Sequence, residues 1–181
     1  FSLVTQQPFD ALASNLQRLE LWRSMAPTPD SSRISVDLGD AGVGCAILVT
    51  EFSGVSTSGT SGANAVAFSA STGVDSVSAS TTFLPSFAST ANAVFILSGY
   101  DANNPNDLPN AQYIKIDATN YNTPAEGIAS GWTSSSAVTQ SIWTGTLANR
   151  AALACEVVAD NPSAGGVPSP YYYLRRRREA A

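Results

Sequence analysis

The chain has 181 residues and a mass of 18.8 kDa, which is the size of a single domain. Hydrophobic residues make up 44% of the chain and charged residues only 13%, while serine and threonine number 25 and 15. This composition supports a folded core, and it excludes a coiled coil, a charged disordered chain and a basic nucleic-acid-binding domain.

The charge is unevenly distributed. The formal net charge is −5, but Arg175–Arg178 hold four of the nine basic residues, so residues 1–174 carry a net charge of −8. An acidic body does not attract DNA, RNA or anionic lipid, and we expect no nucleic-acid partner. No apolar run approaches about 18 residues, so we expect no transmembrane helix and no membrane insertion. The absence of histidine removes His-based catalytic triads, His-ligated metals and histidine acid–base chemistry.

The N-terminal stretch fits two patterns. Phe9, Leu12, Leu16 and Leu19 are spaced as on one face of a helix. The run Leu16–Trp22 also fits a strand, with Leu19 and Leu21 on one face and Arg18, Glu20 and Trp22 on the other. The strand is slightly favoured, and the prolines at positions 27 and 29 end either element as a turn.

A period of two predicts β-strands along most of the remaining chain. Two runs are apolar at nearly every position, Val43–Phe52 and Asn92–Gly99, and both are predicted as central strands covered on both faces. Ala151–Val158 is predicted as the last core strand. Shorter runs predict strands at Arg33–Leu38 (with Ile34 and Val36 facing inward), Ala65–Ser69, Ser76–Phe83, Ala111–Asp117 and Val138–Trp143. Turn-forming residues predict loops at Gly54–Gly62, Tyr100–Asn110 and Asn120–Gly131.

Eight to ten short strands separated by turns predict an all-β fold. A two-sheet antiparallel β-sandwich of jelly-roll or immunoglobulin-like type fits best, followed by a C-terminal tail. We place the sandwich domain at residues 1–160, a linker rich in Pro, Gly and Ser at 161–170, and a Tyr/Arg tail at 171–181. The chain begins at Phe1 and shows no signal peptide, so we expect a processed product, a fragment or the visible part of a longer chain.

Two cysteines and two glutamates lie in or beside apolar runs. Cys45 and Cys155 are too few for a disulfide framework, and buried free thiols are favoured over a bridge between them. Glu51 and Glu156 could form a general acid–base pair if they shared one cleft, as in a glycosidase. The favoured interpretation is that they face solvent or accept local hydrogen bonds, and no catalytic residue is assigned.

The loop Asp101–Asp107 is rich in oxygen ligands of the kind that calcium prefers. It departs from the EF-hand pattern, because Asn106 stands where the glycine is needed and Gln112 where the glutamate is needed. A turn stabilised by Asn and Asp side chains is favoured, and we predict no metal and no cofactor.

Aromatic side chains could form a stacking surface for sugars. Trp22, Trp132, Trp143, Tyr113 and Tyr121 are the available rings, and Trp132, Trp143 and Tyr121 are the candidate glycan contacts beside the Asp101–Asp107 loop. Ordinary core packing is the favoured interpretation.

The C-terminal tail joins three tyrosines to four arginines. Both residue types are enriched at protein–protein interfaces, and an unstructured solvated tail is the alternative. The candidate partner-binding residues are Tyr171, Tyr172, Tyr173, Arg175, Arg176, Arg177 and Arg178.

The segment Glu51–Thr72 resembles little-characterised domains of phage and bacterial genomes. There an apolar strand ends in a carboxylate and an aromatic residue, as at Glu51-Phe52, and a loop rich in Ser, Thr and Gly follows, as at Gly54–Gly62. Later strands correspond to Ala91–Gly99 and Ala151–Val158. The resemblance implies a virion-associated or surface-displayed sandwich and brings no catalytic set.

The expected function is therefore that of a non-enzymatic structural component of a phage virion, as a decoration, fibre or tail-associated protein. Its expected partners are other virion proteins or further copies of itself, as a homo-oligomer, and its expected location is the particle surface. The alternative is a carbohydrate-binding surface module that binds a host-surface glycan.

Overall fold

The computed structural model describes residues 1–9, 17–25, 34–37, 45–74, 78–82, 88–101, 108–122, 125–134, 138, 140–144, 149–160 and 168–171. These residues are mostly β-strand, and the strands pair antiparallel, which confirms the all-β class. The helical segment among them is a short 3-10 stretch, η1 (Thr60–Ala65). No helix in the described ranges is long and apolar enough to cross a membrane.

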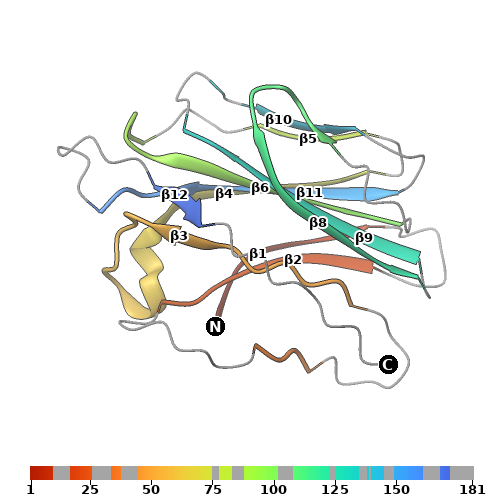
Figure 1. The fold of residues 1–181 in the computed structure, drawn as a ribbon, viewed down its shortest axis with the longest axis horizontal. Helices are drawn as coiled ribbons and strands as arrows, with labels where there is room; N and C mark the ends of the chain where they lie inside the picture. The colour runs from red at the N-terminus through yellow and green to blue at the C-terminus, as the bar shows by residue number, and fades with distance from the viewer. Residues whose placement is uncertain are drawn as a thin grey trace.

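The strands form a five-stranded sheet and three smaller ones (Figure 1). The five-stranded central sheet has the order β4 (Val66–Val74), β11 (Arg150–Val157), β6 (Ala93–Tyr100), β9 (Ala125–Thr133) and β8 (Ile114–Asn122). The smaller sheets are the hairpin of β1 (Ser2–Phe9) and β2 (Gln17–Arg23), the sheet β5 (Ser78–Thr82), β10 (Gln140–Thr144) and β7 (Leu108–Pro109), and the pair β12 (Ser169–Tyr171) and β3 (Glu51–Ser53).

Both faces of the central sheet are buried. Every residue of β6 and β11 is buried, because successive side chains point to opposite faces and each face carries its own hydrophobic cluster. One cluster lies toward β10 and contains Val94, Ile96, Tyr100, Tyr113, Ala129, Val138, Trp143, Ala152 and Ala154. The other lies toward the hairpin and contains Phe9, Leu19, Ala93, Phe95, Leu97, Ala151, Leu153, Cys155 and Val157.

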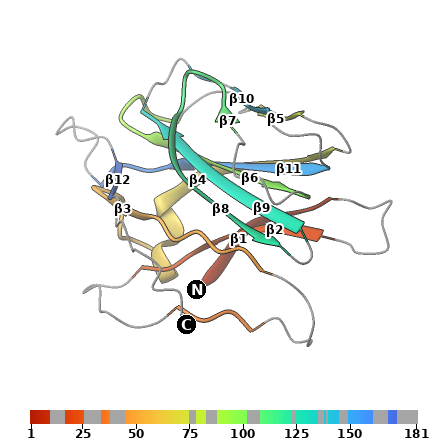
Figure 2. The same ribbon diagram turned by 45° about the vertical axis from the view of Figure 1, so that its right-hand side comes forward.

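The β5–β10–β7 sheet and the β1–β2 hairpin cover opposite faces of the central sheet. The views in Figures 1 and 2 show β5 and β10 on one side of it and the β1–β2 hairpin on the other. On the β10 side, the fully buried Trp143 shares its cluster with the small side chains of Ala152 and Ala154. Small residues opposite a large ring fill the space between two sheets without a void.

Glycines let the hairpin approach the central sheet closely. A Cβ at Gly73 of β4 would lie 2.7 Å from the backbone oxygen of Pro8 in β1. A Cβ at Gly99 of β6 would lie 3.1 Å from Cδ1 of Leu19 in β2. Because these two glycines have no side chain, the hairpin can pack directly on β4 and β6.

Two of the predicted strands, at Val43–Phe52 and Arg33–Leu38, differ from the structure. Residues 45–50 of the run Val43–Phe52 form no strand, and β3 covers only its last residues and Ser53. Ile47 and Val49 are 44% and 67% exposed, so this segment is not a central strand. Residues 34–37 also form no strand, and Ile34 and Val36 are exposed. Apolar composition alone did not distinguish these segments from β6 and β11, which gain burial by pairing on both edges.

Other predicted elements agree better with the structure. The N-terminal segment is a strand, β2, and the runs at Asn92–Gly99 and Ala151–Val158 correspond to β6 and β11. The loop predicted at Asn120–Gly131 is wrong, because β8 continues to Asn122 and β9 begins at Ala125. The end of the predicted linker is folded, since Pro168 and Pro170 are buried and β12 pairs with β3. The turn predicted around positions 27 and 29 lies outside the described residues.

Three residues that lie side by side on adjacent strands allow a test of packing in the central sheet: Gly127, Tyr100 and Arg150. Gly127 and Arg150 both pair with Tyr100, and a Cβ on Gly127 would overlap the Tyr100 ring, while the Arg150 guanidinium lies 5.8 Å from the ring centroid. Gly127→Ala should therefore lower the free energy of unfolding by about 1–3 kcal/mol, because a packed ring must move.

Chemical denaturation of a double-mutant cycle measures this coupling. The Gly127→Ala cost should shrink in a Tyr100→Ala background, where the added methyl group has room. An equal cost in both backgrounds would show that the Tyr100 ring is not what excludes a side chain at position 127.

Candidate functional site

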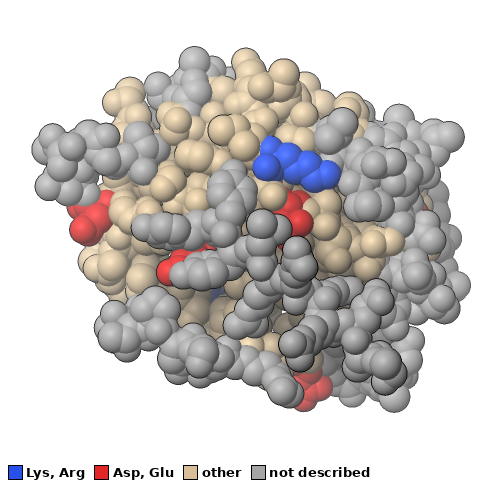
Figure 3. Space-filling view, viewed as in Figure 1, with Lys and Arg blue, Asp and Glu red and all other residues tan. Residues whose placement is uncertain are grey.

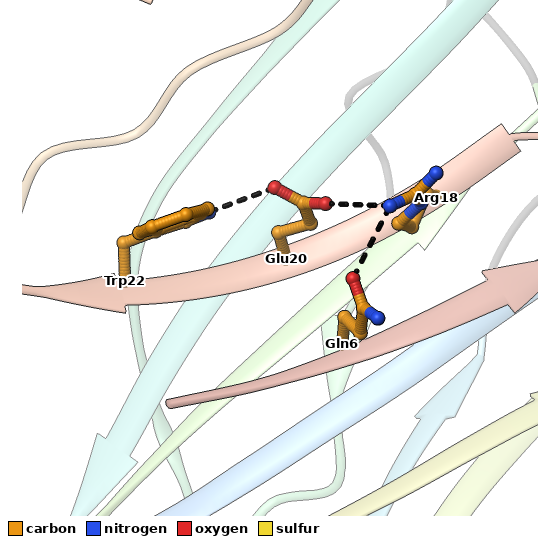
Figure 4. A network of polar contacts seen from close by, with 4 residues as sticks. All are labelled: Gln6, Arg18, Glu20 and Trp22. Carbon is orange, nitrogen blue, oxygen red and sulfur yellow. Dashed lines mark hydrogen bonds and ion pairs between the residues drawn. The ribbon is translucent and has the colours of Figure 1, made fainter. Parts of the chain in front are cut away.

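The outward side of the β1–β2 hairpin carries a connected set of side chains, Leu3, Gln6, Arg18, Glu20 and Trp22, which we call the hairpin face. Its polar members form one network, drawn in Figure 4. Trp22 donates its indole N–H to Oε2 of Glu20 at 2.8 Å, and Arg18 donates Nη1 to the other oxygen, Oε1, at 3.3 Å. The same Nη1 also donates to Oε1 of Gln6 on β1 at 3.3 Å.

Strand geometry explains why these residues meet. Arg18, Glu20 and Trp22 alternate along β2 and therefore point to one side, while Leu19 and Leu21 point to the core. Gln6 pairs with Glu20 across the hairpin. The Arg18–Glu20 ion pair is exposed and adds little to folding stability. Its effect is to orient the Glu20 carboxylate, which in turn holds the Trp22 ring.

One end of the hairpin face is apolar. Leu3 pairs with Trp22, and the two side chains are 40% and 49% exposed. The segment 45–50 adds exposed apolar side chains at Ile47 and Val49. The charge of Glu20 contributes, after burial and Glu126, to the raised pKa of Cys45 at the start of this segment. Exposed apolar side chains with a polar rim are typical of surfaces that bind other proteins.

Figure 3 shows isolated acidic and basic side chains among mostly uncharged residues on the described part of the face in view. The described residues on that face form no basic patch.

The predicted glycan contacts do not form one platform. Trp143 is fully buried in the cluster under β10, so a sugar could not reach its ring without opening that packing. Trp132 is half-buried against the hairpin-side cluster, and its indole nitrogen is inaccessible to solvent. Tyr113 is also core. Tyr121 lies on β8, with its side chain outside the described structure. The exposed tryptophan of the predicted set is Trp22.

The two glutamates occupy different environments. Glu156 is 2% exposed, and its Oε1 accepts hydrogen bonds from the backbone N–H of Ala88 at 2.7 Å and from Nδ2 of Asn92 at 2.8 Å. Asn92 in turn accepts from the N–H of Ala159 through its Oδ1 at 3.0 Å. Through these hydrogen bonds Glu156 links the segment before β6 to the residues that follow β11. Glu51 is exposed on β3.

Both cysteines are free thiols. Cys155 is buried in the hairpin-side cluster, and burial raises its pKa to about 12, with a smaller opposite effect of Arg23. Cys45 is half-buried, and its pKa is raised by burial first and then by the charges of Glu126 and Glu20. A raised pKa leaves little thiolate at neutral pH, which disfavours nucleophilic chemistry at either position.

The predicted tail contacts lie largely beyond what the structure describes. Tyr171 is the last residue of β12 and pairs with Glu51, but its side chain is not described. The remaining tail residues, Tyr172, Tyr173, Arg175, Arg176, Arg177 and Arg178, lie outside the described residues, as do positions 102–107 of the loop considered for calcium. Within the described ranges, no group of three or more His, Cys, Asp and Glu side chains is placed to hold a metal ion.

Sequence reasoning identified Trp22 as an aromatic candidate and placed Arg18 and Glu20 on its face of a possible strand. It did not assign Arg18 and Glu20 to a site, and it missed Gln6. A signal was present, because alternation in the run Arg18–Trp22 already places Arg18 and Glu20 beside Trp22 if the segment is a strand. The contribution of Gln6 required the register of the hairpin, which depends on how β1 and β2 pair.

The contrast between the two glutamates is testable. Glu156→Gln should lower the free energy of unfolding by about 1.5–3 kcal/mol, because it weakens two hydrogen bonds to a buried charged acceptor. Glu51→Gln, the matched control on an exposed strand, should change it by less than about 0.5 kcal/mol. Urea denaturation compares the three proteins. Equal losses of unfolding free energy in both variants would show that the hydrogen bonds of Glu156 do not stabilise the fold.

No family model, no curated protein and no solved structure matches this chain. The resemblance of Glu51–Thr72 to phage and bacterial domains therefore stays a prediction.

Proposed function

We propose that this chain is a non-enzymatic structural component of a phage particle and that it acts through protein–protein contacts. It would serve as a decoration, fibre or tail-associated protein on the particle surface. Its partners would be other virion proteins or further copies of itself.

The architecture supports this proposal. A central sheet buried on both faces and covered by smaller antiparallel sheets is compatible with a β-sandwich of jelly-roll or immunoglobulin-like type. The resemblance of Glu51–Thr72 to phage and bacterial domains points in the same direction. A body with few charges and a doubly covered sheet suits a particle component whose role is to present surfaces.

The observation that carries the proposal is the hairpin face with the neighbouring segment 45–50. Leu3, Trp22, Ile47 and Val49 are each at least 40% exposed. Fully burying an exposed aliphatic side chain contributes about 1.5–3 kcal/mol, so covering several of them would favour association. The Trp22–Glu20–Arg18 network keeps the tryptophan ordered before contact, which lowers the entropy lost on binding.

The C-terminal tail provides a second, separate contact. In sequence, four arginines follow a body whose residues 1–174 carry a net charge of −8. A tail from one copy and the body of another are therefore complementary in charge. Such complementarity raises the rate of encounter and helps to set the orientation.

Light scattering of purified protein tests the proposal. The full chain should associate as its concentration rises. A chain ending at Tyr171 keeps β12 intact and should associate less, because it lacks the arginines. Trp22→Ala should weaken association about tenfold or more, as expected for an aromatic anchor.

Ile114→Ala is the matched control, because Ile114 is an exposed aliphatic residue (56%) that belongs to β8 and not to the hairpin face. It should associate like the parent chain. Equal weakening by Ile114→Ala would rule out the hairpin face as the contact. A full chain that stays monomeric at every concentration would contradict self-association and favour a foreign partner.

The second candidate function is carbohydrate binding on a virion or cell surface. One observation favours it, namely that the exposed Trp22 ring lies beside the carboxylate, guanidinium and amide groups of Glu20, Arg18 and Gln6. Aromatic rings stack on sugars, and such polar groups bind their hydroxyls. The candidate contact therefore moves from Trp132, Trp143 and Tyr121 to the hairpin face.

A glycan array separates the two functions. If the chain is a lectin, the parent chain should bind defined glycans and Trp22→Ala should lose binding, whereas Trp22→Phe should retain part of it through ring stacking. Uniform absence of binding across the array would contradict the carbohydrate function and leave protein contact as the proposal.

A further inference from the structure

The segment 45–50 leads into β3 with the alternation of a strand (Figure 1). Phe52 of β3 points to the core, where its ring meets the Phe95 ring edge-on with the centroids 5.4 Å apart. Exposure alternates in the residues before it, because Ile47 and Val49 are exposed and the residue that follows each of them is partly buried. A period of two is the geometry of a β-strand, so the outer and inner sides of β3 continue along this segment.

The segment has no strand partner in the described structure. Residues 45–50 make no backbone hydrogen bond to another described residue, whereas β3 pairs with β12 from Glu51 onward. An extended apolar edge with unpaired N–H and C=O groups is a template for one more strand. Chain that could fill this edge is close, because β12 ends at Tyr171, opposite Glu51, and residues 172–181 follow it outside the described structure.

The register of β12 on β3 decides which residues would meet. Tyr171 pairs antiparallel with Glu51, and each further step along the tail corresponds to one step back from Glu51. The pairs in that register are Tyr172–Thr50, Tyr173–Val49 and Leu174–Leu48. Tyrosine favours strands, and an aromatic ring beside a β-branched residue is a favourable cross-strand pair. The sequence after β12 therefore suits the edge that β3 leaves unpaired.

Charge favours the same arrangement. The arginines at positions 175–178 come next, and in this register they would begin opposite Ile47 and continue toward Cys45. Negative charge acts there, because the pKa of Cys45 is raised by burial first and then by the charges of Glu126 and Glu20. The positive run and this end of the segment are thus complementary in charge.

We propose that residues 172–174 extend β12 and pair as an added strand with residues 48–50 of the same chain. The chain's own tail is the occupant, because the pairing of Tyr171 with Glu51 holds the next residues beside the edge at a high effective concentration. Tyr173 would lie beside Val49 on the outer side and would widen the apolar surface of the segment. This pairing goes beyond the proposed function, and it holds whether or not that surface binds a partner.

The type of each residue pair makes the register testable. Pro170 has no N–H, so its pair with Phe52 is of the non-hydrogen-bonded type. Pair types alternate along an antiparallel ladder, so Tyr172 and Thr50 would again form a non-hydrogen-bonded pair, in which side chains lie closest. Tyr173 and Thr50 would be out of register by one residue and would point to opposite sides.

Disulfide trapping in the full chain tests this register. The test variant is Thr50→Cys with Tyr172→Cys, and the matched control is Thr50→Cys with Tyr173→Cys. Both carry Cys45→Ala, which removes the neighbouring thiol. The test variant should form a disulfide within one chain about tenfold faster or more than the control, because only its side chains have the required separation.

The products are separated by non-reducing electrophoresis and mapped by mass spectrometry. A bridge within one chain that forms preferentially in the test variant supports the proposal. The proposal is overturned if the two variants oxidise at the same rate or if neither forms a bridge. A bridge between two chains would also overturn it and would assign the edge to the tail of a second copy.

Amide exchange followed by NMR tests the pairing without introduced cysteines. In this register the N–H of Val49 points to the added strand and the N–H of Thr50 points away from it. The Val49 amide should exchange about tenfold or more slowly in the full chain than in a chain ending at Tyr171, and the Thr50 amide should exchange equally in both.

Dilution distinguishes this pairing from association between copies. Protection of Val49 that is unchanged on dilution supports pairing within one chain. Equal Val49 rates in the full and shortened chains would overturn the proposal, and so would protection that disappears on dilution. Light scattering of the same samples tests the proposed contact function separately, so failure of one proposal does not imply failure of the other.

Discussion

The burial of β6 and β11 on both faces is the constraint on which the rest of the molecule depends. A strand with apolar side chains on both sides is stable only if both sides are covered, because each exposed face would leave hydrophobic area in water. The β10 sheet covers one face and the hairpin covers the other. The positions of both outer layers, and of the surfaces that they present, follow from this requirement.

Polar groups at the ends of the two strands complete the arrangement. At one end Glu156 accepts from Ala88 and Asn92 and holds the chain where it enters β6. At the other end Asp101, the residue after β6, donates its backbone N–H to Asn149 and accepts a hydrogen bond from Gln17 at the start of β2.

The hairpin joins the core to the candidate surface. Its inner residues, such as Leu19, pack on the central sheet, Gln17 at the start of β2 donates a hydrogen bond to Asp101, and its outer residues form the face with Trp22. An ordered hairpin presents a better-defined surface to a partner, since less conformational entropy is lost on binding.

Residue pattern alone determined the all-β class and the strands β6 and β11. It slightly favoured a strand at β2, in which alternation places Arg18, Glu20 and Trp22 together. These are local properties, because a period of two sets which side chains share a face. Only the tertiary structure decided that Val49 and Ile47 are exposed while β6 is buried, since both segments are equally apolar and burial depends on which strands find partners on both edges. It also decided the meeting of Gln17 and Asp101, residues far apart in the chain that come together only through packing of the hairpin on the central sheet.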